Sequence, residues 1–113
     1  MTHEERVTNE ARARILKALA HPSRIFIVDT LQDGPKPVNE LARLVGSDVS
    51  TVSRHLSVLK GVGVLSDRRD GVTTYYQLAC PCVQSFFQGI EMVLRHNLSM
   101  QQSALNPPEN VPS

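Results

Sequence analysis

The sequence predicts a mainly α-helical domain that carries one small β-hairpin, in the order α-α-α-α-β-β-α. Apolar residues recur at helical spacing over most of the 113 residues. This period gives way to β-branched and aromatic residues on either side of a single Asp-Gly pair near residue 70. The length allows one compact domain, which we place at residues 1–99, and we expect residues 100–113 to form a flexible C-terminal tail.

The first two predicted helices are separated by a histidine-proline pair. Apolar residues at helical spacing run from Glu4 to Ala20. Pro22 disfavours helical geometry in the preceding His21 and is itself a good first helical residue. We therefore expect the first helix to end near Ala20 and the second to run from Pro22 to Leu31.

Two short helices follow a glycine-proline break. The first spans Val38 to Val45 and is followed by Gly46, a typical residue for ending a helix. The second starts after Asp48, which we expect to be its N-cap, and runs through Lys60. Two helices joined by a few residues that include a glycine have the sequence shape of a helix-turn-helix.

The helical period ends after Lys60. Strands are predicted over residues 64–69 and 72–78, on either side of the Asp70 and Gly71 pair that favours a type I′ turn. A last helix is predicted from Pro81 to about Ser99. A helix-turn-helix followed by a hairpin is a winged helix-turn-helix, whose helix fits the major groove of DNA and whose hairpin can reach the adjacent backbone.

Candidate DNA contacts lie on the fourth helix and on the hairpin. Short hydroxyls and a guanidinium can approach phosphates and base edges. The alternatives are a solvated helix face, interior packing for the histidine, and ion pairs between the hairpin arginines and neighbouring acids. The candidates are Ser50, Thr51, Ser53, Arg54 and His55 on the helix, and Arg68 and Arg69 on the hairpin.

The basic residues are unevenly distributed although the net charge is only +1. Residues 12–24 hold four basic side chains and no acidic one, and residues 51–76 hold four basic and two acidic ones. One face of the domain can therefore be electropositive, which is compatible with binding a polyanion. Charge alone fits a solvated helix face equally well.

Four segments resemble successive signatures of the ArsR/SmtB family, in that family's order and spacing, and the resemblance covers about residues 10–98. It implies a homodimeric transcriptional repressor that leaves its operator when an inducer binds. Val49 departs from the family pattern, which often has Gln there, and a valine can touch a thymine methyl but cannot hydrogen-bond a base. The segments are LKALAHPSR at residues 16–24, VNELA at 38–42, STVSRHL at 50–56 and YYQL at 75–78.

The first and last helices carry more apolar surface than one small winged helix needs. Each large side chain buried against a second copy would contribute about 1.5–3 kcal/mol. The alternative is that this surface packs only on its own domain. Two-fold pairing would place the reading helices about one DNA turn apart, which predicts a near-palindromic double-stranded operator. The predicted dimer contacts are Val7, Ala11, Phe86, Phe87, Ile90 and Leu94.

Cys80 and Cys82 flank Pro81 at the expected start of the last helix. We expect Cys80 at the N-cap and Cys82 in the first turn, where the helix dipole favours the thiolate. Thiolates bind soft ions, so trivalent arsenic or another thiophilic metal is the inducer we expect, whereas DNA binding itself needs no cofactor. Sensing of thiol oxidation or of reactive sulfur is an alternative, and so is the absence of any sensing role.

Several protein classes are excluded by the sequence. No apolar run reaches the roughly 18–20 residues needed to span a bilayer, and the N-terminus does not resemble a signal peptide, so we expect a cytoplasmic protein. A glycine-rich phosphate loop and a recognisable catalytic set are both missing, so we expect no enzyme. The remaining alternative is a winged helix that binds a protein partner instead of DNA.

Overall fold

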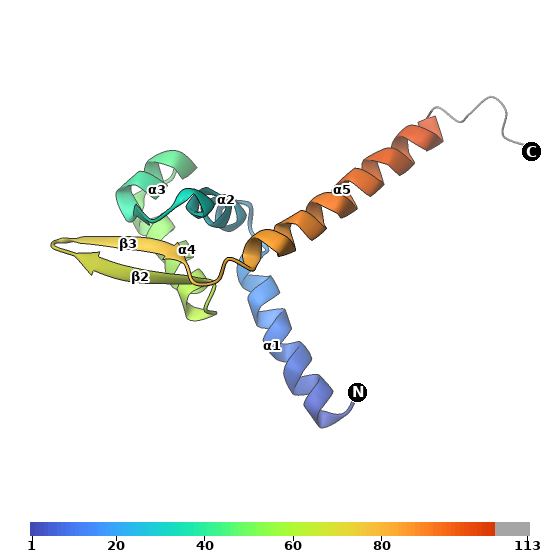
Figure 1. Ribbon diagram of the computed structural model, residues 1–113, viewed down its shortest axis with the longest axis horizontal. Coiled ribbons are helices and arrows are strands. Elements are labelled where there is room, and N and C mark those ends of the chain that lie inside the picture. The colour runs from blue at the N-terminus through green and yellow to red at the C-terminus, as the bar shows by residue number, and fades with distance from the viewer. Residues whose placement is uncertain (106–113) are drawn as a thin grey trace, which may run out of the picture. The chain divides into compact units, whose positions relative to one another are not determined.

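The computed structural model describes residues 1–105 (Figure 1). The chain divides into two units, the first ending at Pro81 and the second beginning at Cys82. We describe each unit by itself. The elements of the first unit are α1 (His3–Leu19), α2 (Pro22–Thr30), the 3₁₀ turn η1 (Leu31–Asp33), β1 (Lys36–Pro37), α3 (Val38–Val45), α4 (Val49–Gly61), β2 (Leu65–Asp70) and β3 (Thr73–Leu78). The second unit contains α5 (Val83–Leu105).

Side chains cap the first two helices. The Thr2 hydroxyl accepts a hydrogen bond of 3.1 Å from the backbone N–H of Glu5 at the start of α1. At the start of α2, Nδ1 of His21 accepts a 3.1 Å bond from the backbone N–H of Ser23, and Pro22 is the first helical residue. The break predicted at His21 and Pro22 is confirmed, and the imidazole does what Ser or Asp usually does at an N-cap.

The helix-turn-helix has the predicted bounds to within a residue. α3 ends at Val45, where Gly46 adopts a left-handed conformation with φ of 81°. Glycine reaches this region without steric cost, which is why it ends helices so often. The chain then enters α4 at Asp48, whose side chain caps that helix.

The hairpin belongs to a three-stranded antiparallel sheet in the order β1-β3-β2. The hairpin was predicted, but the edge strand β1 was not. Lys36 pairs with Tyr76, and Pro37 pairs with Tyr75. A two-residue strand has no periodicity to detect, and proline is tolerated in a sheet only where its missing N–H leaves no ladder bond unmade, as at an edge.

The turn of the hairpin differs from the predicted one. Asp70 pairs with Thr73, so the two turn residues are Gly71 and Val72 instead of Asp70 and Gly71. Gly71 has a φ of 65°, whereas no residue other than glycine has a positive φ among the described residues. A type I′ turn needs a positive φ at both positions, so a glycine at the first position alone fits type II′. In Figure 1 this turn lies at the opposite end of the first unit from α1.

The core of the first unit is apolar and draws on α1, α2, α3, α4 and β2, with Ala18 and Leu19 buried at the end of α1. The spacing of its α4 members is helical, so they all lie on one side of that helix. The largest fully buried side chains are Ile27 and Val28 of α2, Leu41 of α3, Val52, Leu56 and Leu59 of α4, and Leu65 of β2.

The second unit is a single long helix among the described residues. α5 begins at Val83, two residues later than predicted, and continues to Leu105, six residues beyond the predicted end. Residues 100–105 of the predicted tail are therefore helical, and the rest of that tail lies outside the described residues. None of the helices in the described part of the chain combines the length and the hydropathy required to cross a bilayer.

We expect Leu56→Ala to lower the free energy of unfolding by about 2–5 kcal/mol, because it leaves a cavity in a fully buried position of α4. Urea denaturation followed by circular dichroism measures this. The matched control is Val72→Ala, which removes methyl groups from a side chain that is 92% exposed and should change stability by less than about 0.5 kcal/mol. Equal losses in the two variants would contradict this core.

Candidate nucleic-acid interface

The start of α4 is stabilised by the carboxylate of Asp48. Its Oδ1 accepts a 2.7 Å bond from the backbone N–H of Thr51 and a 3.1 Å bond from the hydroxyl of Ser50. The bonds from Thr51, followed by the one from Ser50, lower the pKa of Asp48. The charged carboxylate thus caps the N-terminus of α4, where the helix dipole favours a negative charge.

The face of α4 opposite the core is polar. Ser50 and Arg54 are exposed, whereas Thr51 and Ser53 are half-buried. Within residues 1–105 the Arg54 guanidinium forms neither a hydrogen bond nor an ion pair. A guanidinium in this state can bind a phosphate or pair with the acceptors of guanine, and the hydroxyls can reach phosphate oxygens. The structure thus places four of the predicted helix contacts on or at the edge of one surface.

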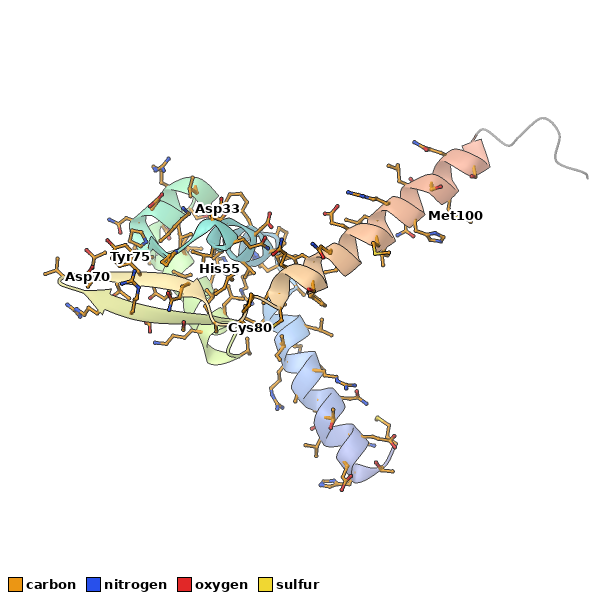
Figure 2. The ribbon with its side chains drawn as sticks, viewed as in Figure 1. Asp33, His55, Asp70, Tyr75, Cys80 and Met100 are labelled. Atoms are coloured by element: carbon orange, nitrogen blue, oxygen red, sulfur yellow. The ribbon has the colours of Figure 1, made fainter. Side chains whose placement is uncertain are left out.

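His55 lies in the interior, unlike the other predicted contacts on α4. It is only 8% exposed and lies among the helices of the first unit (Figure 2). Its Nδ1 accepts a 3.0 Å hydrogen bond from Nε of Arg24, and its ring lies 4.6 Å from that of His21. A side chain held in this way does not reach DNA, so we reassign His55 from the DNA surface to the interior.

The hairpin carries its two arginines near the turn. Arg68 pairs across the sheet with Tyr75, and its guanidinium carbon lies 5.4 Å from the centre of that ring. Nε of Arg69 donates a 3.1 Å bond to the carbonyl of Gly71. Neighbouring residues of a strand point to opposite faces, so the side chains of Arg68 and Arg69 lie on opposite faces of the hairpin. Figure 2 shows Asp70 at the far end of this hairpin.

The ion-pair alternative for the hairpin arginines is not what the structure shows. Asp67 pairs instead with Lys60 of α4, at 2.9 Å between Nζ and Oδ2. The bond and the charge of Asp67 raise the pKa of Lys60. Neither Arg68 nor Arg69 forms an ion pair in the described part of the chain, so both stay available to an external anion. The Lys60 contact also links the end of α4 to the strand that carries them.

The predicted cysteine pair lies outside the helix that follows it. Both Cys80 and Cys82 are disulfide-bonded, and Cys80 is half-buried while Cys82 is exposed. Because α5 begins at Val83, Cys82 precedes the helix and its carbonyl accepts a 3.4 Å bond from the N–H of Phe86. This corrects the predicted position of Cys82 in the first turn. No group of three or more His, Cys, Asp or Glu side chains within residues 1–105 could hold a metal ion.

Comparison with known proteins identifies the family. A family model described as a helix-turn-helix domain matches residues 7–68. The chain is 36% identical over 95 residues to the uncharacterised HTH-type regulator Rv0081 of Mycobacterium tuberculosis, with 83% of each chain covered. It is 39% identical over 80 residues to the biofilm growth-associated repressor of Xylella fastidiosa, with 69% of each covered. It is also 34% identical over 87 residues to the M. tuberculosis regulator Rv0324. The matched residues make up 77% of this chain but only 38% of that longer protein.

The fold is shared with solved structures. A homodimeric winged helix-turn-helix DNA-binding domain from Mycobacterium bovis, Mb0332, a possible ArsR-family transcriptional regulator, superposes with a TM-score of 0.78 at 30% identity, covering 88% of this chain and 93% of that one. The chain belongs to the ArsR-type helix-turn-helix family. It is a DNA-binding transcriptional regulator and not an enzyme.

This ArsR-type regulator exposes apolar side chains on both terminal helices. Val7 of α1 is 51% exposed and Leu94 of α5 is 55% exposed, and Phe86 and Ile90 are exposed as well. The predicted contacts Ala11 and Phe87 are half-buried. The rings of Phe86 and Phe87 lie 6.1 Å apart. All six predicted dimer contacts thus retain surface that a second chain could cover.

Sequence reasoning missed two residues, Lys60 and Arg24, whose side chains contact the elements of the candidate DNA surface. Lys60 was predicted only as the end of α4, and its bond to Asp67 depends on the angle between the helix and the strand. Arg24 belongs to a segment that resembles the family, but its 31-residue separation from His55 leaves no local pattern. The histidine inside the apolar period of α4 was the one signal that pointed to a buried polar contact.

We expect Asp48→Ala to lower the melting temperature at about pH 7, because α4 loses its cap. The folded-state pKa of Asp48 is lowered, so its stabilisation is present above the ordinary value of 3.8 and is lost as the pH falls through the folded value. The difference between wild type and variant should therefore shrink toward about pH 3. Calorimetry at both pH values measures it. Asp48→Asn keeps a capping oxygen and should melt close to the wild type at about pH 7; a deficit as large as that of the alanine variant would contradict the cap.

Proposed function

We propose that this ArsR-type regulator is a homodimeric repressor that holds operator DNA through α4 and the hairpin. The observation that carries the proposal is the division of α4 into an apolar face with fully buried side chains and an outward face with Ser50 and Arg54, whose guanidinium forms no ion pair within residues 1–105. The helix would enter the major groove, and Arg68 and Arg69 would contact the neighbouring backbone. The ion pair between Lys60 and Asp67 would hold both elements in one orientation.

The exposed apolar side chains of α1 and α5 support the homodimer. Exposed aromatic and aliphatic side chains in helical register are typical of surfaces that are covered by a partner. The Mb0332 domain that shares this fold is homodimeric. Two-fold symmetry would present two copies of α4 to successive turns of the duplex, so the operator would be near-palindromic.

The cysteine pair would control release from DNA. Metal sensing requires thiolates, since a disulfide has no thiolate to donate. Trivalent arsenic or another soft metal would therefore act on the reduced protein, with Cys80 and Cys82 supplying two ligands. The disulfide bonding of both cysteines favours the second candidate, in which a peroxide takes two electrons and two protons from the thiols, forms a disulfide and is reduced to water. Reactive sulfur species act on the same thiolates.

We expect Arg54→Ala to weaken operator binding by about 1–3 kcal/mol, because one guanidinium contact to base or phosphate is lost. Arg68→Ala should weaken binding to all duplexes alike and reduce the slope of log K against log salt by about 1. Fluorescence anisotropy with duplexes from the upstream region of its own gene measures both. The control is Arg6→Ala on the exposed surface of α1. Unchanged binding by the Arg54 and Arg68 variants would favour a protein partner for this surface.

We expect an inducer that acts through the cysteines to release the wild type from DNA but not a Cys80→Ser, Cys82→Ser variant. Anisotropy is recorded on the reduced protein after addition of arsenite, cadmium, hydrogen peroxide or polysulfide. Release by arsenite or cadmium alone identifies a metal sensor, and release by peroxide or polysulfide alone identifies a thiol sensor. Equal release of the serine variant would contradict any role of the pair.

A further inference from the structure

A polar cluster joins three helices inside the first unit. Nε of Arg24 donates a 3.0 Å bond to Nδ1 of His55, and Nη1 donates a 3.3 Å bond to the carbonyl of Ala18 at the end of α1. The rings of His21 and His55 lie 4.6 Å apart with 50° between their planes. His21 in turn caps α2 through its Nδ1. One side chain of α2 is thereby connected to both α1 and α4.

The cluster lies where α4 is otherwise apolar. The buried residues of α4 are Val52, His55, Leu56 and Leu59, and among residues 1–105 His55 is the one buried polar side chain. Apolar contacts decide which side of a helix faces the core but are not directional, whereas a hydrogen bond between fixed atoms is directional. The bond to His55 therefore constrains the rotation of α4 about its axis. Arg54, the exposed guanidinium of the DNA surface, is the residue next to it.

The bond exists only with a neutral imidazole. A guanidinium donates and never accepts, so Nδ1 of His55 must carry no proton to receive the bond from Arg24. Protonation would remove the acceptor and place a second positive charge beside the guanidinium. Burial, followed by the charges of His21, Arg24 and Arg54, lowers the pKa of His55. Within the described residues these are the titratable and charged groups that act on it: His21 and Arg24 from the start of α2, and Arg54 from α4 itself, while α1 contributes the carbonyl of Ala18.

We propose that Arg24 and His55 are positioning residues for DNA binding, and that protonation of His55 in mild acid releases α4 from the orientation in which it reads DNA. This inference rests on the proposed function of α4 as the reading helix. The affinity for DNA is then high at neutral pH and falls in acid, against the general trend by which added positive charge strengthens binding to phosphates. The opposite sign of these two effects makes the inference testable.

The experiment compares DNA affinity at about pH 7.5 and pH 5.5 at constant ionic strength, spanning the ordinary range of histidine titration. For the wild type we expect affinity to fall about tenfold in acid, the size of one lost hydrogen bond to a charged group. His55→Asn offers an amide oxygen to Arg24 and does not titrate, so it should bind like the wild type at the higher pH and lose little in acid. His96→Asn, at an exposed histidine of α5, is the matched control and should keep the wild-type profile.

Two further variants separate positioning from folding. His21→Asn retains a side-chain cap for α2 and should keep most of the acid effect. Arg24→Met removes the donor and its charge, so it should bind DNA weakly at both pH values while circular dichroism shows a folded protein. It also tests the inference if His55→Asn does not fold. The pKa of His55 is lowered in the fold. Its stabilising contribution is therefore present above its ordinary value of 6.5 and is lost as the pH falls toward the folded value. We expect the melting temperature of the wild type to fall over the same pH range.

The outcomes distinguish failure of this inference from failure of the proposed function, DNA binding through α4. Absence of DNA binding by the wild type at about pH 7.5 overturns the proposed function and this inference with it. Binding that persists while His55→Asn keeps the wild-type pH profile overturns this inference alone. This inference is also overturned if the loss of DNA affinity in acid disappears in His21→Asn but not in His55→Asn. Wild-type binding that is stronger in acid than at neutral pH overturns it as well. A flat profile in His55→Asn with a retained profile in His96→Asn is the result we expect.

Discussion

The burial of one face of α4 is the constraint on which the rest of this structure depends. Val52, Leu56 and Leu59 have no exposed surface, and their spacing commits one side of the helix to the core. With 3.6 residues per turn, the opposite side of the helix, which carries Ser50 and Arg54, faces outward. Ser50 and Arg54 therefore reach solvent for the same reason that the leucines do not. The surface proposed to contact DNA is therefore set by the packing of the opposite, apolar side of α4.

Polar contacts at three points then orient the buried helix. Asp48 caps its N-terminus, Lys60 links its last turn to β2, and Arg24 contacts its middle through His55. Surface ion pairs such as that of Lys60 add little to stability. The core thus stabilises the unit, while the polar contacts link α4 to α2 and to the strand that carries Arg68 and Arg69.

Elements governed by neighbouring residues were predictable from the sequence. The break at Pro22, the end of α3 at Gly46 and the cap at Asp48 each depend on atoms within a few residues, and all three are confirmed. The turn of the hairpin was shifted by one residue, because the register between strands decides which two residues stay unpaired. The edge strand at Pro37 was missed, because its pairing partner Tyr75 is far away in the chain.

By itself, the sequence determined the order of the helices and the hairpin, the outward polar residues of α4 and the family resemblance, since periodicity, proline, glycine and capping residues act locally. Only the tertiary structure decided that His55 is an interior residue held by Arg24, that Asp67 pairs with Lys60 and leaves the hairpin arginines available, and that Cys82 precedes α5. Each of these depends on the distance between groups on different elements or on where a helix begins in space. Spacing along the chain carries no information about such distances, because packing sets them.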